Sequence, residues 1–265
     1  MVEGATTPIP GAGQSPLRAE DDRLLRGQGR FIGSIDLPGM AHAVVLRSAH
    51  ARARLLSVDT SAALGMPGVL GVFTSQDLID AGVQPIGFHA AVPAENGGEM
   101  SAPPRHALAR DEVRHVGEPI ALVVAQTRHA ALDAAERIEV SVEPLPAVSG
   151  IAAALQATAP QIWPGAPGNI VGRYEYGDHA AVAAARQAAA QVVRLRIVNQ
   201  RVAPTAMEPR GAVGVWHDTE SRYTLHVASQ TPHLTRQLLA TVFGITEHQL
   251  RVQVGDIGGG FGSKV

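Results

Sequence analysis

Apolar and polar residues alternate along several short stretches of this chain, the pattern of half-buried β-strands. The alternation predicts strands at Gly39–Leu46, Val69–Phe73, Ile138–Val142, Val192–Val202, Ala212–Trp216, Tyr223–Ala228 and Leu250–Val254. A further strand is predicted over Val113–Ala125, interrupted by a turn at Gly117-Glu118-Pro119.

Helical patterns fall between these strands. Ser75 is the predicted N-cap of one short helix, and Thr127 can cap another over His129–Arg137. An Ala-rich helix is predicted over Ala180–Ala190. A last helix has Pro232 in its first turn and runs to about Phe243, where Gly244 can end it.

The mixture of short strands and helices predicts an α+β fold in two blocks. We expect a flexible N-terminal tail over residues 1–17, a first domain over 18–147, a linker over 148–168 and a second domain over 169–265. The linker is expected because several prolines interrupt the patterns there. Inside the first domain, Phe88–Arg105 reads as a loop.

Composition excludes several classes of protein. A net charge of −2 and a pI of about 6.6 favour neither nucleic acid nor an anionic membrane as the partner. The absence of cysteine excludes disulfides, thiolate zinc sites and an iron–sulfur cluster held by this chain alone. The sequence shows no secretory signal and no run of about 18 apolar residues, so we expect a cytoplasmic protein without a membrane span.

The glycine cluster Gly258-Gly259-Gly260-Phe261-Gly262 is the most informative motif. Glycine accepts positive φ and exposes its N–H groups, so the cluster suits an anionic ligand, although a tight turn is an equally good reading. Ser263 stands where a phosphate-binding P-loop requires glycine before the lysine. The same serine replaces the third glycine of a dinucleotide-binding motif, so neither of these motifs is supported.

Other polar residues leave alternatives open. Gln230 lies at a strand-to-helix junction, where it could satisfy backbone groups or contact a ligand. Glu208 could act as a general base, but an ion pair that supports a turn, with Arg210 two positions away, is the favoured reading. The eleven histidines make neither a His-x-His nor a His-Glu-x-x-His pair, so a histidine-bound metal is not expected.

Several segments, taken in order, resemble the molybdenum-binding large subunit of the xanthine dehydrogenase and aldehyde oxidase family of molybdenum hydroxylases. In the first block the resemblance rests on Gly29-Arg30-Phe31, Leu46-Arg47-Ser48-Ala49-His50-Ala51, Pro67-Gly68-Val69, Val116-Gly117-Glu118-Pro119-Ile120-Ala121 and Leu145-Pro146. In the second block it rests on Asn199-Gln200-Arg201, Met207-Glu208-Pro209-Arg210, Ser229-Gln230-Thr231-Pro232-His233 and Gly258-Gly259-Gly260-Phe261-Gly262-Ser263-Lys264. The resemblance implies an a/b hammerhead domain followed by the beginning of a molybdenum-cofactor-binding domain.

The resemblance also implies site residues. Gln230 matches the family glutamine whose amide lies beside the molybdenum, and Phe261 matches the loop residue in the metal environment. With Gly259, Gly260 and Gly262, these residues are expected to bind the molybdopterin cofactor, in its cytosine dinucleotide form. Positive φ is expected at Gly260, where a β-branched residue would also obstruct the cofactor.

The implied reaction hydroxylates an electron-poor carbon with oxygen from water. Electrons then pass to 2Fe-2S and FAD partner subunits, as in the three-subunit bacterial arrangement. An aldehyde, an N-heteroaromatic compound or a carbon monoxide-type substrate is expected, and Val265 in place of glutamate argues against xanthine. The family's general base lies beyond the glycine motif, so no catalytic residue is assigned to this chain. Activity is therefore expected only when the C-terminal half of the large subunit, in the same or a separate chain, completes the site. The alternatives are a non-catalytic interaction or assembly module and an inactive fragment.

Overall fold

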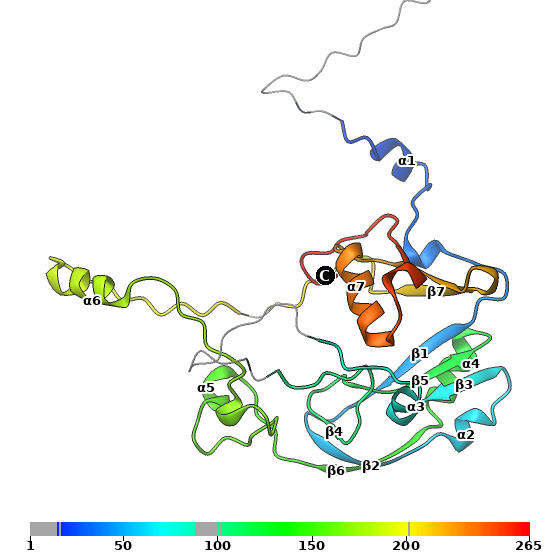
Figure 1. Ribbon diagram of the computed structural model, residues 1–265, viewed down its shortest axis with the longest axis horizontal. Helices are drawn as coiled ribbons and strands as arrows, with labels where there is room; N and C mark the ends of the chain where they lie inside the picture. The colour runs from blue at the N-terminus through cyan, green and yellow to red at the C-terminus, as the bar shows by residue number, and fades with distance from the viewer. Residues whose placement is uncertain (1–14, 16, 88–99, 101, 201) are drawn as a thin grey trace, which may run out of the picture. The chain divides into compact units, whose positions relative to one another are not determined.

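The computed structural model describes residues 15, 17–87, 100, 102–200 and 202–265, and these fall into two units (Figure 1). The smaller unit gathers the described residues up to Asp36 with Pro204–His233 and Arg251–Val265. The larger unit comprises the described residues of Leu37–Ala203 together with Leu234–Leu250. The first and last stretches of the chain thus lie in the same unit, although they are far apart in the sequence. The domain boundaries given above remain a prediction, and most of the expected N-terminal tail lies outside the described residues.

Two antiparallel three-stranded sheets form the larger unit. The first has the order β1-β5-β3, and the second has the order β4-β2-β6. Their strands are β1 (His42–Arg47), β2 (Ala53–Asp59), β3 (Val69–Phe73), β4 (Glu112–Val113), β5 (Pro119–Ala125) and β6 (Glu139–Pro144). The predicted break before Pro119 is confirmed, because Gly117 turns the chain with φ +87°.

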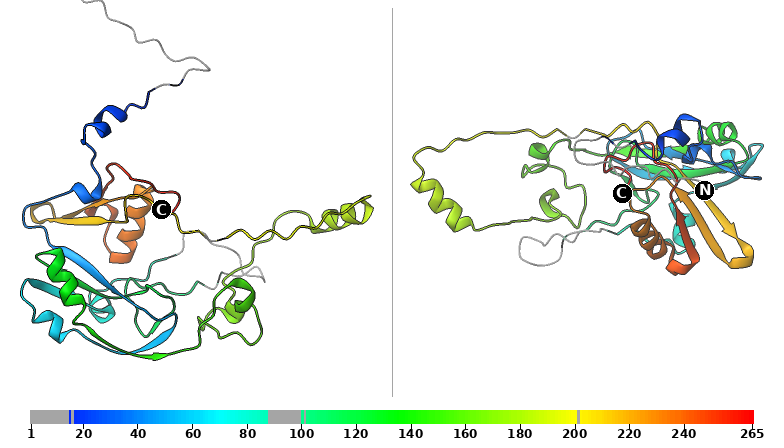
Figure 2. Two further views of the ribbon diagram at one scale, coloured as in Figure 1. Left: turned by 180° about the vertical axis from the view of Figure 1, so that it is seen from behind. Right: turned by 90° about the horizontal axis from the view of Figure 1, so that it is seen from above.

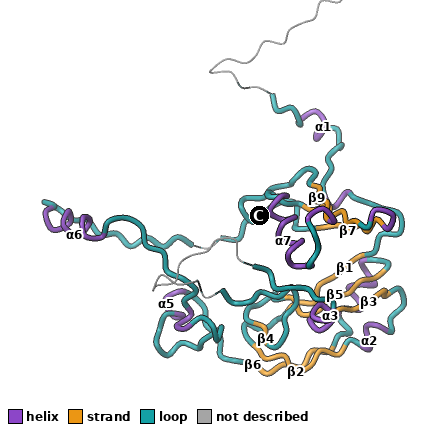
Figure 3. Tube along the Cα trace, viewed as in Figure 1, coloured by secondary structure: helices purple, strands orange, loops and turns teal. Residues whose placement is uncertain are grey.

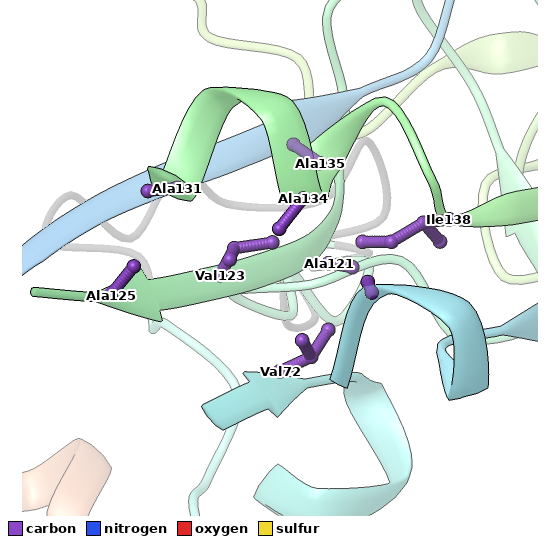
Figure 4. Close-up of a cluster of buried hydrophobic side chains, with 9 residues drawn as sticks. Val72, Ala121, Val123, Ala125, Ala131, Ala134, Ala135 and Ile138 are labelled. Carbon is purple, nitrogen blue, oxygen red and sulfur yellow. The ribbon is translucent and has the colours of Figure 1, made fainter. Parts of the chain in front are cut away.

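Two apolar clusters are buried in the larger unit, and the one drawn in Figure 4 lies between the first sheet and helix α4 (Arg128–Ala135). The helix faces the sheet with the small residues Ala131, Ala134 and Ala135, so it can approach β5 closely. Val123 at the centre of β5 is fully buried. The predicted cap is confirmed, since the Thr127 side chain accepts a hydrogen bond from the Ala130 N–H at 3.1 Å.

Helix α3 (Ser75–Asp80) begins one residue away from the prediction. Its N-cap is Thr74 and not Ser75, because Thr74 is extended and forms a capping box with Asp77. The Asp77 carboxylate accepts the Thr74 N–H at 2.6 Å. An aspartate three residues after a threonine is therefore the stronger start signal here.

The predicted strand at Val192–Val202 is wrong for its described residues. Figure 3 draws the chain between helix α6 (His179–Ala188) and β7 (Ala212–His217) without a strand. A strand needs a neighbour to bind its N–H and C=O groups, and the described residues offer none to this stretch. Alternation in the sequence indicates how side chains are arranged, but it does not supply the pairing strand.

The smaller unit contains the hairpin of β7 and β8 (Arg222–Val227), seen from two further sides in Figure 2. Ser221 makes the hairpin turn in the left-handed region, with φ +47°. Strand β9 (Leu250–Gln253) lies beside β8 in the order β7-β8-β9. These strands fall where the sequence predicts them.

The remaining helices are α1 (Asp21–Leu25), α2 (Ser61–Leu64), α5 (Ile151–Ala154) and α7 (Pro232–Phe243). Helix α7 ends at Gly244, which has φ +64°, as predicted. Among the residues that the structure describes, no helix has the length and apolar character needed to cross a membrane. The predicted loop at Phe88–Arg105 lies mostly outside the described residues.

Candidate cofactor-binding site

The glycine cluster after β9 forms a loop with an unusual backbone. Gly259 and Gly262 have φ of +100° and +76°, and Phe261 has φ of +51°. A residue with a side chain is strained in this region by roughly 1–2 kcal/mol. Phe261 nevertheless remains 75 % exposed, so burial of its ring does not offset the strain. Such outliers are concentrated at functional sites.

The Gln230 side chain fastens this loop. The side-chain Oε1 accepts the N–H of Gly262 at 3.0 Å and the N–H of Lys264 at 3.4 Å. The backbone N–H of Gln230 donates to the Lys264 carbonyl at 2.7 Å. Two backbone donors at Oε1 fix which end of the amide points inward. The Nε2 group donates no hydrogen bond to any described residue, and Gln230 is exposed. The structure therefore leaves one amide donor for a group outside the described residues.

Gly260 is required for a different reason than expected. Its φ is not positive, so that prediction is wrong. A Cβ atom at Gly260 would lie 2.4 Å from Cδ and 2.5 Å from Oε1 of Gln230. Gly260 and Gln230 are 30 positions apart in the chain, but the loop and the amide approach so closely that no side chain fits at position 260.

The Phe261 ring lies against its own loop. A Cβ atom at Gly259 would come within 2.8 Å of Cε2 of Phe261. Gly259 thus combines a left-handed backbone with contact to the aromatic ring. The site residues expected from the sequence are brought together as one local group, with Gln230 on one side of the glycines and Phe261 among them.

The Glu208 carboxylate anchors the start of the loop. Its Oε2 accepts the Gly258 N–H and the Lys264 Nζ, both at 2.9 Å, and its Oε1 accepts the Ile32 N–H at 3.2 Å. The side chains of Lys264 and Glu208 are only 2 % and 11 % exposed. Glu208 therefore forms an ion pair as predicted, but the predicted partner Arg210 is wrong and the cation is Lys264. Arg210 donates instead to the Ser263 carbonyl.

These contacts decide the protonation of Glu208. Burial raises the pKa of its carboxyl, but the hydrogen bonds from Lys264, Gly258 and Ile32 outweigh that effect and hold the pKa below its ordinary value. A carboxylate so fully engaged is a poor proton acceptor. Glu208 is therefore an anchor of the loop and not a candidate general base.

A second carboxylate, Asp256, ties the N-terminal stretch to the same region. It accepts two hydrogen bonds from the Arg23 guanidinium at 2.6 and 2.7 Å and one from the Arg30 N–H at 2.6 Å. These hydrogen bonds lower the pKa of its carboxyl strongly. Gly255 allows the approach, since a Cβ there would lie 2.3 Å from the Arg30 carbonyl oxygen. The sequence did not indicate this anchor, because neither its residue types nor its spacing of more than 220 positions forms a motif.

An open cavity of about 500 Å³ lies beside the Glu208 anchor. Its lining residues are Phe31, Ile32, Gly33, Met207, Glu208, Pro209, Arg210, Gly211 and Gly258. Among the described residues, no group of three or more His, Asp or Glu side chains could hold a metal ion.

Comparison with known families defines the class of protein. Residues 26–146 match the aldehyde oxidase and xanthine dehydrogenase a/b hammerhead domain, and residues 162–265 match the molybdopterin cofactor-binding domain. The chain belongs to the family of the molybdenum-binding large subunits of molybdenum hydroxylases. Its α+β fold, a hammerhead domain followed by the beginning of a cofactor-binding domain, is confirmed.

Particular relatives place the chain more closely. It is 39 % identical to the nicotine 6-hydroxylase large subunit of Paenarthrobacter nicotinovorans, over 93 % of this chain and 29 % of that protein. It is 34 % identical to the carbon monoxide dehydrogenase large chain of Afipia carboxidovorans, over 97 % of this chain and 32 % of that one.

Among solved structures, quinoline 2-oxidoreductase from Pseudomonas putida 86 is similar with a TM-score of 0.83 and 39 % identity. The match covers 95 % of this chain and 31 % of that one. The chain thus spans about a third of the length of these relatives.

Proposed function

We propose that this chain forms the part of a molybdenum hydroxylase large subunit that presents Gln230 and the loop Gly259–Gly262 to the molybdopterin cofactor. The observation that carries the proposal is the Gln230 amide. Its oxygen is held by two backbone N–H groups, and its Nε2 group makes no hydrogen bond within the described residues. A donor held in one orientation suits the ligand sphere of an anionic cofactor, because it needs no rearrangement on binding.

The loop supplies further donors. The Gly262 N–H is taken by Gln230 and the Ser263 N–H by the Gly260 carbonyl, whereas no described residue accepts the N–H groups of Gly260 and Phe261. Successive free N–H groups beside a left-handed residue form a concave anion site. We assign these two N–H groups to the cofactor, with Gly259 and Gly262 shaping the backbone. The exposed Phe261 ring would cover one side of the bound group.

When bound, the cofactor would supply the oxidation of an electron-poor carbon, with water as the oxygen source. The names of the relatives support an aldehyde, N-heteroaromatic or carbon monoxide-type substrate, since they include a nicotine hydroxylase, a quinoline oxidoreductase and a carbon monoxide dehydrogenase. We propose the cytosine dinucleotide form of the cofactor. This form and a cytoplasmic location are expectations carried over from the sequence.

The proposal also assigns redox cofactors to partner subunits. The chain contains no cysteine, so it supplies no thiolate ligand for a 2Fe-2S cluster, and we assign the 2Fe-2S clusters and FAD to partner subunits. Because Glu208 is committed to Lys264, the general base is assigned to the part of the large subunit that this chain does not cover. Activity is accordingly proposed only for the completed assembly. The alternative, an interaction module that holds no cofactor, differs in one measurable property, the molybdenum content.

The first test is to purify the tagged chain from its native host together with the chains that accompany it, and to measure molybdenum by mass spectrometry. We expect molybdenum in the complex. A complete assembly of large, iron–sulfur and flavin chains that contains no molybdenum would overturn the proposal.

The second test isolates the amide donor. Gln230→Glu keeps an oxygen for Gly262 and Lys264 but replaces the NH₂ group with a second carboxylate oxygen, so it removes the donor and adds a negative charge. A charge-assisted hydrogen bond contributes about 1.5–3 kcal/mol, so turnover per molybdenum should fall roughly 10- to 100-fold. The matched control is Gln237→Ala on helix α7, an exposed glutamine whose side chain makes no hydrogen bond to a described residue. Equal turnover of both variants would refute the assignment of Gln230.

A further inference from the structure

A second cavity lies in the larger unit, between the stretch around β4 and the stretch that follows α5. Its volume is about 520 Å³, a size within the roughly 300–1,000 Å³ of small-molecule sites. The described residues that line it all belong to the larger unit, and none of them is proposed above to bind the cofactor. A ligand held there would therefore use a different set of side chains.

Part of the lining is apolar. It consists of Pro104, Ala109, Pro119, Ile162 and Trp163. The guanidinium carbon of Arg114 lies 3.9 Å from the centre of the Trp163 ring, and Arg114 Nε donates to the Ile162 carbonyl at 3.4 Å. The Asn169 side chain accepts the Ile162 N–H at 2.9 Å. These contacts hold the indole ring and the Ile162 side chain beside the cavity, where they offer apolar surface to a ligand.

The rest of the lining is polar and carries an excess of cations. Its charged groups are the guanidinium groups of Arg105, Arg110 and Arg114 and the carboxylates of Asp111, Glu112 and Glu118. Arg52, which does not line the cavity, also binds Glu112, so four guanidinium groups stand against three carboxylates. A ligand with a single negative charge would balance this excess.

Arg110 and His106 are the groups available to bind that charge. The side chain of neither makes a hydrogen bond or an ion pair with a described residue. Burial lowers the pKa of His106, and the charges of Arg110 and Arg114 lower it further against the opposing effect of Asp111. The electrostatic potential at the imidazole is therefore positive, which favours an anion beside it.

We propose that this cavity binds an aromatic carboxylate, with the ring against Ile162 and Trp163 and the carboxylate bound by Arg110 and His106. The ring matches the apolar lining, and the carboxylate forms charge-assisted hydrogen bonds with the guanidinium group. A phosphate ester, with about two negative charges at neutral pH, exceeds the positive charge of the cavity. The inference goes beyond the proposed function, because it involves neither the cofactor nor its loop.

Isothermal titration calorimetry of the purified chain with benzoate tests the proposal. Benzamide is one control ligand, since it has the same ring and shape without the charge. Acetate is the other, because it has the charge without the ring. We expect saturable binding of benzoate, with benzamide and acetate each bound at least about 10-fold more weakly, since each lacks one of the two interactions.

Two substitutions locate the binding site. Arg110→Gln removes the cation and should weaken benzoate binding roughly 10-fold or more. Arg128→Gln is the matched control, because Arg128 is an exposed arginine at the start of α4 that does not line the cavity. Arg110 is exposed as well, so both variants should fold like the parent chain.

Trp163 provides a signal from inside the cavity. The chain contains two tryptophans, Trp163 and Trp216. In a Trp216→Phe variant, tryptophan emission reports on Trp163 alone. This emission should change with benzoate concentration and give the dissociation constant that calorimetry gives.

The pH dependence tests the part given to His106. A bound carboxylate favours the protonated imidazole, so benzoate should bind more tightly at about pH 6 than at about pH 8. His115 is the other histidine of the lining, 3.5 Å from Glu118, and the remaining charged groups around His106 are those named above. His106→Gln should remove the pH dependence, and His115→Gln should keep it. The reverse result would overturn the role of His106.

Three further outcomes would overturn the inference. One is the absence of saturable benzoate binding, and another is benzamide binding as tight as that of benzoate. The third is binding that Arg110→Gln and Arg128→Gln weaken equally or that leaves the Trp163 emission unchanged, since either result places benzoate elsewhere. None of these measurements involves molybdenum, so this inference and the proposed function can fail separately.

Discussion

The two units of the molecule differ in the interactions that stabilise each of them internally. The larger unit buries an apolar cluster of alanine, valine and isoleucine side chains between a sheet and helix α4. In the smaller unit, Ala228 is the single buried apolar residue among those described. Its buried polar residues are Thr224, Ser229 and Lys264. The unit that carries the candidate site is thus fastened mainly by polar contacts.

The difference has a consequence for function. Apolar burial is not directional, so a core such as that around Val123 fixes which elements meet but leaves backbone groups free to adjust. Hydrogen bonds to a carboxylate or an amide require particular distances and angles. Glu208 and Asp256 each bind a backbone N–H of the N-terminal stretch and a cationic side chain. Such contacts hold the glycine loop in one conformation, as a preorganised binding site requires.

The largest effect that tests this comparison is expected for Lys264→Met. The change leaves the Glu208 carboxylate buried without its cation, which typically costs about 3–5 kcal/mol. The free energy of unfolding should be measured by urea denaturation. The matched control is Arg236→Met, which breaks the exposed pair with Glu247 and should cost about 0–1 kcal/mol. Equal costs for the two pairs would show that burial does not distinguish them.

Acid should weaken the same ion pair. The pKa of Glu208 lies below its ordinary value of 4.5 in the folded chain, so its contribution to stability is complete above pH 4.5 and is lost as the pH falls through the folded-state pKa. Urea denaturation at a series of pH values should show this loss. Glu208→Gln should flatten the profile below pH 4.5, whereas Glu247→Gln, at the exposed pair, should leave its shape unchanged. Two profiles of equal slope would contradict the pKa shift.

A smaller effect is expected in the apolar core of the larger unit. Val123→Ala removes two methyl groups at a fully buried position and should lower the free energy of unfolding by about 2 kcal/mol. Val116→Ala is the matched control in the same unit, because Val116 is 65 % exposed. Its substitution should change stability by less than about 0.5 kcal/mol. A cost at Val123 as large as that of Lys264→Met would remove the contrast between the two units.

The sequence predicts local features better than contacts between distant residues. Strand β3 and the Thr127 cap could be predicted because the determining residues lie within a few positions of each other. The cofactor-binding role of Gln230 and the glycine loop comes from the family resemblance and stays a prediction. The Lys264 partner of Glu208 and the Arg23–Asp256 pair could not be predicted. When charged residues lie far apart in a sequence, the sequence does not show which of them form pairs. The wrong strand at Val192–Val202 has a related origin, because alternation along a sequence does not show whether a pairing strand is present.

Two glycines of the loop are required for different reasons, Gly260 for a close contact and Gly262 for its backbone conformation. Gly262→Ala meets no atom within 4 Å and should cost about 1 kcal/mol through its φ of +76°. Gly260→Ala has no such φ but should cost about 1–2 kcal/mol, because its methyl group displaces the Gln230 side chain. The amide signals of Gln230 in NMR spectra provide the discriminating measurement. They should shift in Gly260→Ala more than in Gly262→Ala, and the reverse order would contradict the contact.

The smallest effect concerns one polar contact, a helix cap, in the unit that has the apolar core. Thr127→Ala removes the hydrogen bond to the Ala130 N–H at the start of α4 and should cost about 1 kcal/mol. Thr60→Ala is the matched control, because Thr60 occupies the N-cap of α2 without such a bond, and it should cost close to nothing. A Thr127→Ala variant that loses several kcal/mol would mean that a polar contact, and not the alanine face of α4, holds the helix on its sheet. The contrast between the two units would then be one of degree, with directional contacts decisive in both.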